Sequence, residues 1–78
     1  MIVKVLGSGC NKCKTLETQI QKLKENYNLD IEIEKITQIN DIISYGVMMT
    51  PGLIINGEVK SVGKIPKDDQ ILKWIKGE

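Results

Sequence analysis

The apolar positions in the first half of the chain follow two different periods. Residues 2–6 form a short run rich in β-branched side chains, and residues 31–36 alternate isoleucine with mostly charged residues. Both patterns are typical of β-strands. Between them, apolar side chains recur at spacings of three and four, which puts them on one face of a helix. The members of this face are Cys13, Leu16, Ile20, Leu23 and Tyr27.

A second and shorter helical pattern covers about residues 38–45. Thr37 is a candidate N-cap for this helix, because its hydroxyl can accept a hydrogen bond from a free backbone N–H of the first turn. Gly46 suits the position just after the last helical residue. The inward-facing side chains of the helix would be three isoleucines: Ile39, Ile42 and Ile43.

The last third of the chain predicts a β-hairpin and a final helix. The apolar segment 53–55 and the segment 58–62 flank Asn56-Gly57, a pair that favours the type I′ turn between antiparallel strands. Asp68 and Asp69 suit a helix N-terminus, where negative charge is favoured. Beyond them, the apolar face comprises Ile71, Leu72 and Ile75, with Trp74 as a further candidate, and the basic C-terminal end comprises Lys73 and Lys76.

The predicted order is therefore βαβαββα. The first strand, helix and strand require a parallel crossover, and the hairpin adds antiparallel strands. We expect an α/β fold with a four-stranded mixed sheet and helices on both faces, in a single domain over residues 1–78.

Composition narrows the function classes. The net charge of the 78 residues is +1, and all eleven basic residues are lysine, so no arginine fork is present for phosphates or guanine edges. We therefore expect neither nucleic acid nor membrane as a partner. No segment has the length of a transmembrane helix, and the N-terminus does not resemble a signal peptide. We expect a cytoplasmic monomer.

The chemistry of the chain centres on its two cysteines, Cys10 and Cys13. Cys10 is predicted at the junction of the first strand and the long helix, where the helix dipole favours the thiolate, which is the nucleophilic form. Lys12 and Lys14 add positive charge nearby. Cys13 falls one turn later on the inner face, within reach of Cys10. This asymmetry suits thiol–disulfide exchange, in which an exposed sulfur attacks and a shielded one resolves.

Other interpretations of the two cysteines stay open from the residues alone. They can be packing residues, or they can form a two-thiolate copper or zinc carrier, although a structural zinc site needs four ligands and the chain has no histidine. A redox-sensing module without turnover is a third alternative. The glycines of Gly7-Ser8-Gly9 fit a tight turn that leaves Cys10 uncrowded better than they fit a phosphate loop.

Two segments together resemble a known family. GSGCNKC at a strand-to-helix junction, followed by MTPGLIINGEV, is similar to the thioredoxin fold and most similar to small thioredoxin-like, redox-active disulfide proteins of glutaredoxin size. The resemblance covers essentially the whole chain. It implies that Pro51 is a cis-proline facing the cysteines and that the Thr50 backbone pairs with an extended substrate. From the residues alone, trans is the expected isomer.

The resemblance departs from the best-known thioredoxin pattern in places. Gly9 replaces a tryptophan before the first cysteine, Asn11-Lys12 replaces Gly-Pro, and no buried acidic residue is evident in the first two strands; Glu32 and Glu34 alternate with isoleucine and are expected in solvent. These departures bear on the proton relay and the electron donor more than on the fold.

The combined expectation is a thiol–disulfide oxidoreductase that reduces protein or small-molecule disulfides. Cys10 would be the nucleophile and Cys13 the resolving residue, with Thr50 and Pro51 binding substrate and Lys12 and Lys14 tuning the pKa of Cys10. No cofactor or metal is expected besides the Cys10–Cys13 disulfide. The expected partners are disulfide-containing proteins or small thiols and a reductase or thiol donor.

Overall fold

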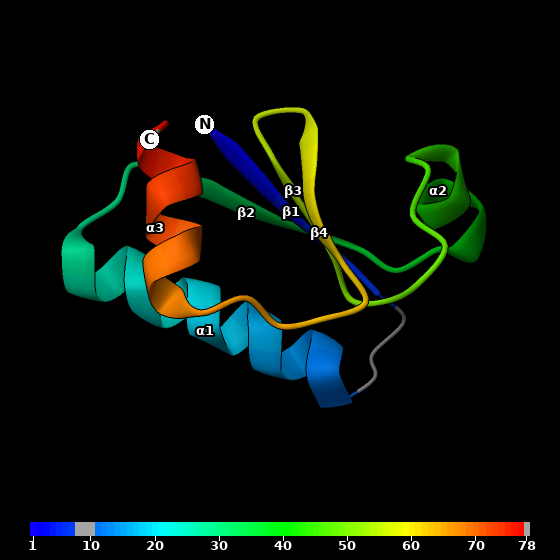
Figure 1. Ribbon diagram of the computed structural model, residues 1–78, viewed down its shortest axis with the longest axis horizontal. Helices are drawn as coiled ribbons and strands as arrows, with labels where there is room; N and C mark the ends of the chain where they lie inside the picture. The colour runs from blue at the N-terminus through cyan, green and yellow to red at the C-terminus, as the bar shows by residue number, and fades with distance from the viewer. Residues whose placement is uncertain (8–10, 78) are drawn as a thin grey trace.

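The structure of the protein is a computed structural model that describes residues 1–7 and 11–77. Its elements follow the predicted order of strands and helices (Figure 1). They are β1 (Ile2–Leu6), α1 (Asn11–Tyr27), β2 (Glu32–Ile36), α2 (Ile39–Ser44), β3 (Gly52–Ile55), β4 (Glu58–Val62) and α3 (Asp68–Lys76).

The four strands form one mixed sheet in the order β2-β1-β3-β4. β1 pairs with β2 in parallel and with β3 antiparallel, and β3 pairs antiparallel with β4. Leu6, the last residue of β1, lies opposite both Ile36 and Gly52. The end of β1, the end of β2 and the start of β3 therefore meet at one end of the sheet, which is the end from which the chain enters α1.

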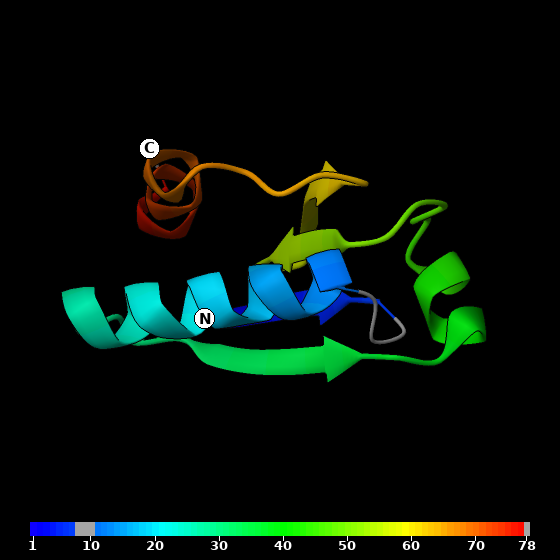
Figure 2. The same ribbon diagram turned by 90° about the horizontal axis from the view of Figure 1, so that it is seen from below.

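One face of the sheet carries the larger hydrophobic core, beneath α1 and α3, which lie against each other (Figures 1 and 2). Four of the five residues predicted for the inner face of α1 are buried: Cys13, Leu16, Ile20 and Leu23. The prediction for Tyr27 is wrong, since its side chain is 56% exposed. The physical reason is length: 17 helical residues extend about 26 Å, whereas a five-residue strand spans only about 17 Å, so the end of α1 lies beyond the sheet.

The opposite face carries a smaller core of Leu6, Ile42, Val47 and Ile54, covered by α2. The helices thus lie on both faces, as predicted. Ile42 is the only buried residue of α2, whereas Ile39 and Ile43 are 66% and 53% exposed, which corrects the predicted inner face. The N-cap is Gln38 rather than Thr37, and it forms no side-chain cap hydrogen bond.

The hairpin between β3 and β4 matches its sequence pattern. Asn56 and Gly57 have φ angles of +53° and +85°, the left-handed values that a type I′ turn needs at both central positions. α3 also begins and ends as predicted, with Asp68 and Asp69 in its first turn and Lys73 and Lys76 in its last. Within the described residues, no helix is long and apolar enough to span a membrane.

Candidate active site

Cys13 lies near the amino end of α1 and points into the protein. Its side chain is only 5% exposed, as predicted for a shielded sulfur. The described part of α1 has no acidic residue in its first turn, and Lys12 and Lys14 flank Cys13 on exposed positions. The free backbone N–H groups of a helix start carry partial positive charge, so the surroundings of this end of α1 favour an anion. Cys10 and Gly9 lie outside the described residues.

Gly7 forms the floor of the site. It is buried at the end of β1, and its N–H donates a hydrogen bond of 2.9 Å to the carbonyl of Ile36. A Cβ atom placed on Gly7 would overlap Cys13 Sγ and would lie 2.9 Å from Cys13 Cβ and 3.8 Å from Thr50 Cβ. Cys13 and Thr50, which are far apart in sequence, therefore converge over the same glycine.

This contact gives Gly7 a role that the sequence did not reveal. The turn expected over Gly7-Ser8-Gly9 lies mostly outside the described residues, and Gly7 itself does not have a positive φ angle. Its missing side chain instead leaves the space that the Cys13 side chain occupies. A glycine three residues before Cys10 is the only signal in the sequence, and it does not say which atom fills the space.

The segment that faces this floor is Thr50-Pro51. The peptide bond between the two residues is cis, the isomer that the family resemblance implied. Pro51 is fully buried, and its carbonyl accepts a hydrogen bond of 2.9 Å from the N–H of Gly63. Thr50 is exposed. The site thus combines a buried proline, held by the loop after β4, with an exposed threonine beside it.

Close packing holds the cis-proline segment on two sides. A Cβ on Gly52 would lie 2.8 Å from Val47 Cγ1, and a Cβ on Gly63 would lie 3.2 Å from both Cβ and Cε of Met49. Met49 thus lies over Gly63 while remaining 63% exposed, and Met48 is 80% exposed. These exposures favour an apolar rim over core filling for the two methionines.

Charged residues elsewhere near the sheet have simple roles. Glu32 and Glu34 are exposed, as expected. Lys4, on the α2 face, donates a hydrogen bond of 2.8 Å to the Tyr45 hydroxyl, and this bond raises the pKa of Lys4 above 10.5.

Among residues 1–7 and 11–77, no three cysteine, aspartate or glutamate side chains gather closely enough to hold a metal ion.

The fold and this arrangement define the class of the protein. Residues 1–76 match the family model described as thioredoxin domain, and the chain belongs to that family. This is a family of thiol–disulfide oxidoreductases.

Individual relatives agree with this assignment. The chain is 32% identical over 73 residues to a thioredoxin of Methanothermobacter thermautotrophicus, covering 94% of this chain and 95% of that protein. It is also 32% identical over 76 residues to a thioredoxin of Methanocaldococcus jannaschii, covering 97% of this chain and 87% of that protein. A solved structure described as that of a malarial protein superposes with a TM-score of 0.70 at 19% identity, covering 97% of this chain and 93% of that one, which supports the fold alone.

Proposed function

We propose that the protein is a thiol–disulfide oxidoreductase that uses Cys10 and Cys13 to reduce disulfides of proteins or small molecules. The observation that carries the proposal is the convergence of a buried Cys13 and the Thr50–Pro51 segment over Gly7 at the start of a helix. Membership of the thioredoxin family supports the same chemistry.

The proposed reaction begins at Cys10. Its thiolate attacks one sulfur of a substrate disulfide, which breaks the S–S bond, forms a mixed disulfide and releases the other substrate sulfur, which takes up a proton. The positive end of α1, together with Lys12 and Lys14, favours the thiolate that this step needs.

Cys13 completes the exchange. Its thiolate attacks the Cys10 sulfur, so the Cys10–Cys13 disulfide forms and the second substrate sulfur leaves as a thiol. Two electrons have then passed from the dithiol to the substrate, and an external thiol or dithiol donor restores the reduced pair. Burial of Cys13 suits this resolving role, because a residue that is only 5% exposed is poorly accessible to a substrate disulfide.

Thr50 and Pro51 are proposed to position the substrate. Proline has no backbone N–H to donate, the Thr50–Pro51 bond is cis, and the neighbouring Thr50 is exposed at the same end of the sheet. An extended substrate segment can then pair with the Thr50 backbone. The cytoplasm, where thiol donors are abundant, is the compartment proposed for this reaction.

Single-cysteine variants test the proposal. The reduced protein should reduce a fluorogenic peptide disulfide, Cys10→Ser should abolish the reaction, and Cys13→Ser should accumulate a mixed disulfide at Cys10 that mass spectrometry can locate. Metal content is measured on the same sample. Capture of substrate on Cys13 would reverse the assigned roles, and stoichiometric metal that blocks alkylation of both thiols would refute the redox function in favour of a metal carrier.

A further inference from the structure

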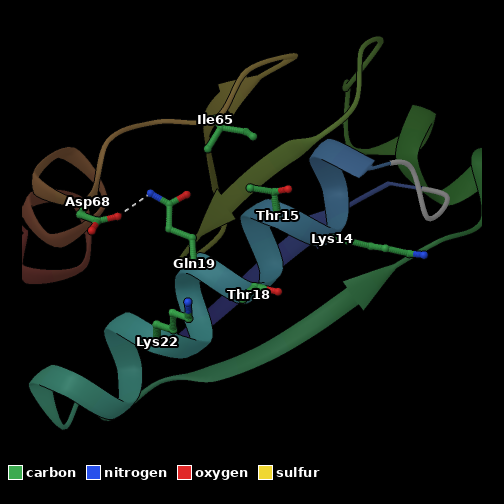
Figure 3. A pocket seen from close by; sticks show the side chains of 7 residues that line it. All are labelled: Lys14, Thr15, Thr18, Gln19, Lys22, Ile65 and Asp68. Atoms are coloured by element: carbon green, nitrogen blue, oxygen red, sulfur yellow. Dashed lines mark hydrogen bonds between the residues drawn. The ribbon is translucent and has the colours of Figure 1, made fainter.

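A groove runs between the exposed side of α1 and the loop that leads into α3. It encloses about 580 Å³, and Figure 3 shows Gln19, Thr15 and Ile65 gathered around it. The Gln19 amide fixes the loop, because its Nε2 donates hydrogen bonds of 2.9 Å to the Pro66 carbonyl and 2.6 Å to Asp68 Oδ1. The groove is therefore pre-formed, as binding sites usually are.

A second groove of about 440 Å³ lies on the other side of the same loop, between the loop and α3. Ile65 lines both grooves and is 37% exposed, so it forms an apolar ridge between them. Trp74, the only tryptophan of the chain, lines the second groove. The base of the loop is tied to the cis-proline segment through the hydrogen bond from Gly63 to Pro51.

Lysines are concentrated around these grooves. The whole chain carries eleven lysines against ten carboxylates, whereas the two linings together contain five lysines and one carboxylate, that of Asp68. The lysines are Lys14, Lys22, Lys60, Lys64 and Lys67. The linings of these grooves are therefore more basic than the chain as a whole.

Most of these lysines lack an acidic neighbour. Within residues 1–7 and 11–77, the ion pairs are those of Lys35 with Glu17 and of Lys60 with Glu58. Among the lysines that line the two grooves, Lys60 is therefore the only one in an ion pair. Asp68 accepts the hydrogen bond from Gln19, and Asp69, in the same first turn of α3, lies outside both linings.

We propose that the two grooves on either side of Ile65 form a docking surface for an acidic, extended segment of a protein partner. Carboxylates of that segment would meet the unpaired lysines, and its apolar side chains would pack on Ile65 and Trp74. A segment of about ten residues extends about 33 Å, enough to cross the molecule, whose longest dimension is 32 Å. The apolar ridge and the absence of arginine favour an acidic polypeptide over a nucleic acid.

Trp74 provides a binding assay that does not require catalysis. The assay therefore tests the docking proposal independently of the redox function. The probe is a cysteine-free peptide of about ten residues that alternates glutamate and leucine. It should change the Trp74 fluorescence saturably at low salt, and the change should fade at about 0.5 M salt because exposed charges are then screened. The same peptide with lysine in place of glutamate should have no effect.

Two matched double variants locate the interaction. Lys64→Gln/Lys67→Gln should weaken binding of the acidic peptide about two- to thirtyfold, since each exposed ion pair contributes modestly. Lys24→Gln/Lys76→Gln, with the same change in net charge from +1 to −1, should leave the affinity unchanged. Lys22→Gln, in the first groove, should weaken it less than the loop pair does.

Three results would overturn the proposal. The first is equal or absent responses to the acidic and the basic peptide. The second is equal weakening by both double variants, which would indicate a general charge effect. The third is a saturable response to a single-stranded oligonucleotide of similar charge with none to the acidic peptide.

Discussion

Replacing Gly7 with alanine tests the packing on which the candidate site rests. The new Cβ would overlap Cys13 Sγ and would lie 2.9 Å from Cys13 Cβ, so either α1 or the end of β1 must shift. Overpacking of a core typically destabilises by about 1–3 kcal/mol. The lower backbone entropy of alanine in the unfolded chain offsets about 0.4–1 kcal/mol of this. We expect a net loss of about 1–2 kcal/mol in the free energy of unfolding.

The loss is measured by urea unfolding and by thermal unfolding under reducing conditions. For a domain of this size, each kcal/mol shifts the melting temperature by about 4–8 °C, so the expected decrease is about 4–16 °C. A double-mutant cycle identifies the cause, because Cys13→Ala removes the overlapping sulfur. In that background, Gly7→Ala should be less destabilising by at least about 0.5 kcal/mol, which is the size of a direct coupling.

Gly46→Ala is the matched control. Nothing lies within 4 Å of a Cβ at Gly46, but its φ angle of +81° strains any other residue. The variant should lose about 1–2 kcal/mol through the backbone alone, and Cys13→Ala should not alter that loss. If Gly7→Ala left stability unchanged, or if its effect were the same with and without the Cys13 sulfur, the packing argument would be refuted.

Two further substitutions test other parts of the structure. Gly52→Ala should destabilise by about 1–3 kcal/mol, because its Cβ would lie 2.8 Å from Val47 Cγ1, and Val47→Ala should relieve most of the effect in urea unfolding. Tyr45→Phe should lower the pKa of Lys4 toward 10.5 in an NMR titration, since the hydrogen bond to the Tyr45 hydroxyl is the main cause of the raised value. Because folding raises the pKa of Lys4, the protonated lysine stabilises the folded protein below pH 10.5. This contribution is lost as the pH rises through the pKa of Lys4 in the folded state. An unchanged Lys4 titration would contradict the assigned cause, and equal destabilisation by Gly52→Ala with and without Val47 would contradict the contact.

Local patterns predicted the elements well where a large surface was available to pack against. The inner face of α1 is buried because the sheet lies along most of its length, and only Tyr27 passes beyond it. The isoleucines of α2 show the reverse case. A helix of six residues has fewer than two turns, so Ile42 alone reaches the core while Ile39 and Ile43 remain in solvent. Periodicity reports which residues share a face, not how much surface lies opposite.

The candidate site was less accessible to sequence reasoning because its contacts are non-local. CxxC and Thr-Pro are visible as motifs, but their separation in sequence does not say that Cys13 and Thr50 converge over Gly7. The isomer of Pro51 was also out of reach of the residues alone, which favour trans, and only the family resemblance indicated cis.

Close backbone approach at three glycines explains how the site is assembled. Gly7, Gly52 and Gly63 each lie where a Cβ would meet a side chain at 3.2 Å or less, and the side chains concerned are Cys13, Val47 and Met49, respectively. At the two turn glycines, Gly46 and Gly57, a Cβ would meet nothing within 4 Å. The turn glycines therefore serve local conformation, Gly7 and Gly52 leave room for a neighbouring side chain, and Gly63, with a φ angle of +74°, does both. Substitutions at these three positions should displace the start of α1 and the cis-proline segment relative to each other, so the spacing around Cys13 depends on residues that carry no side chain.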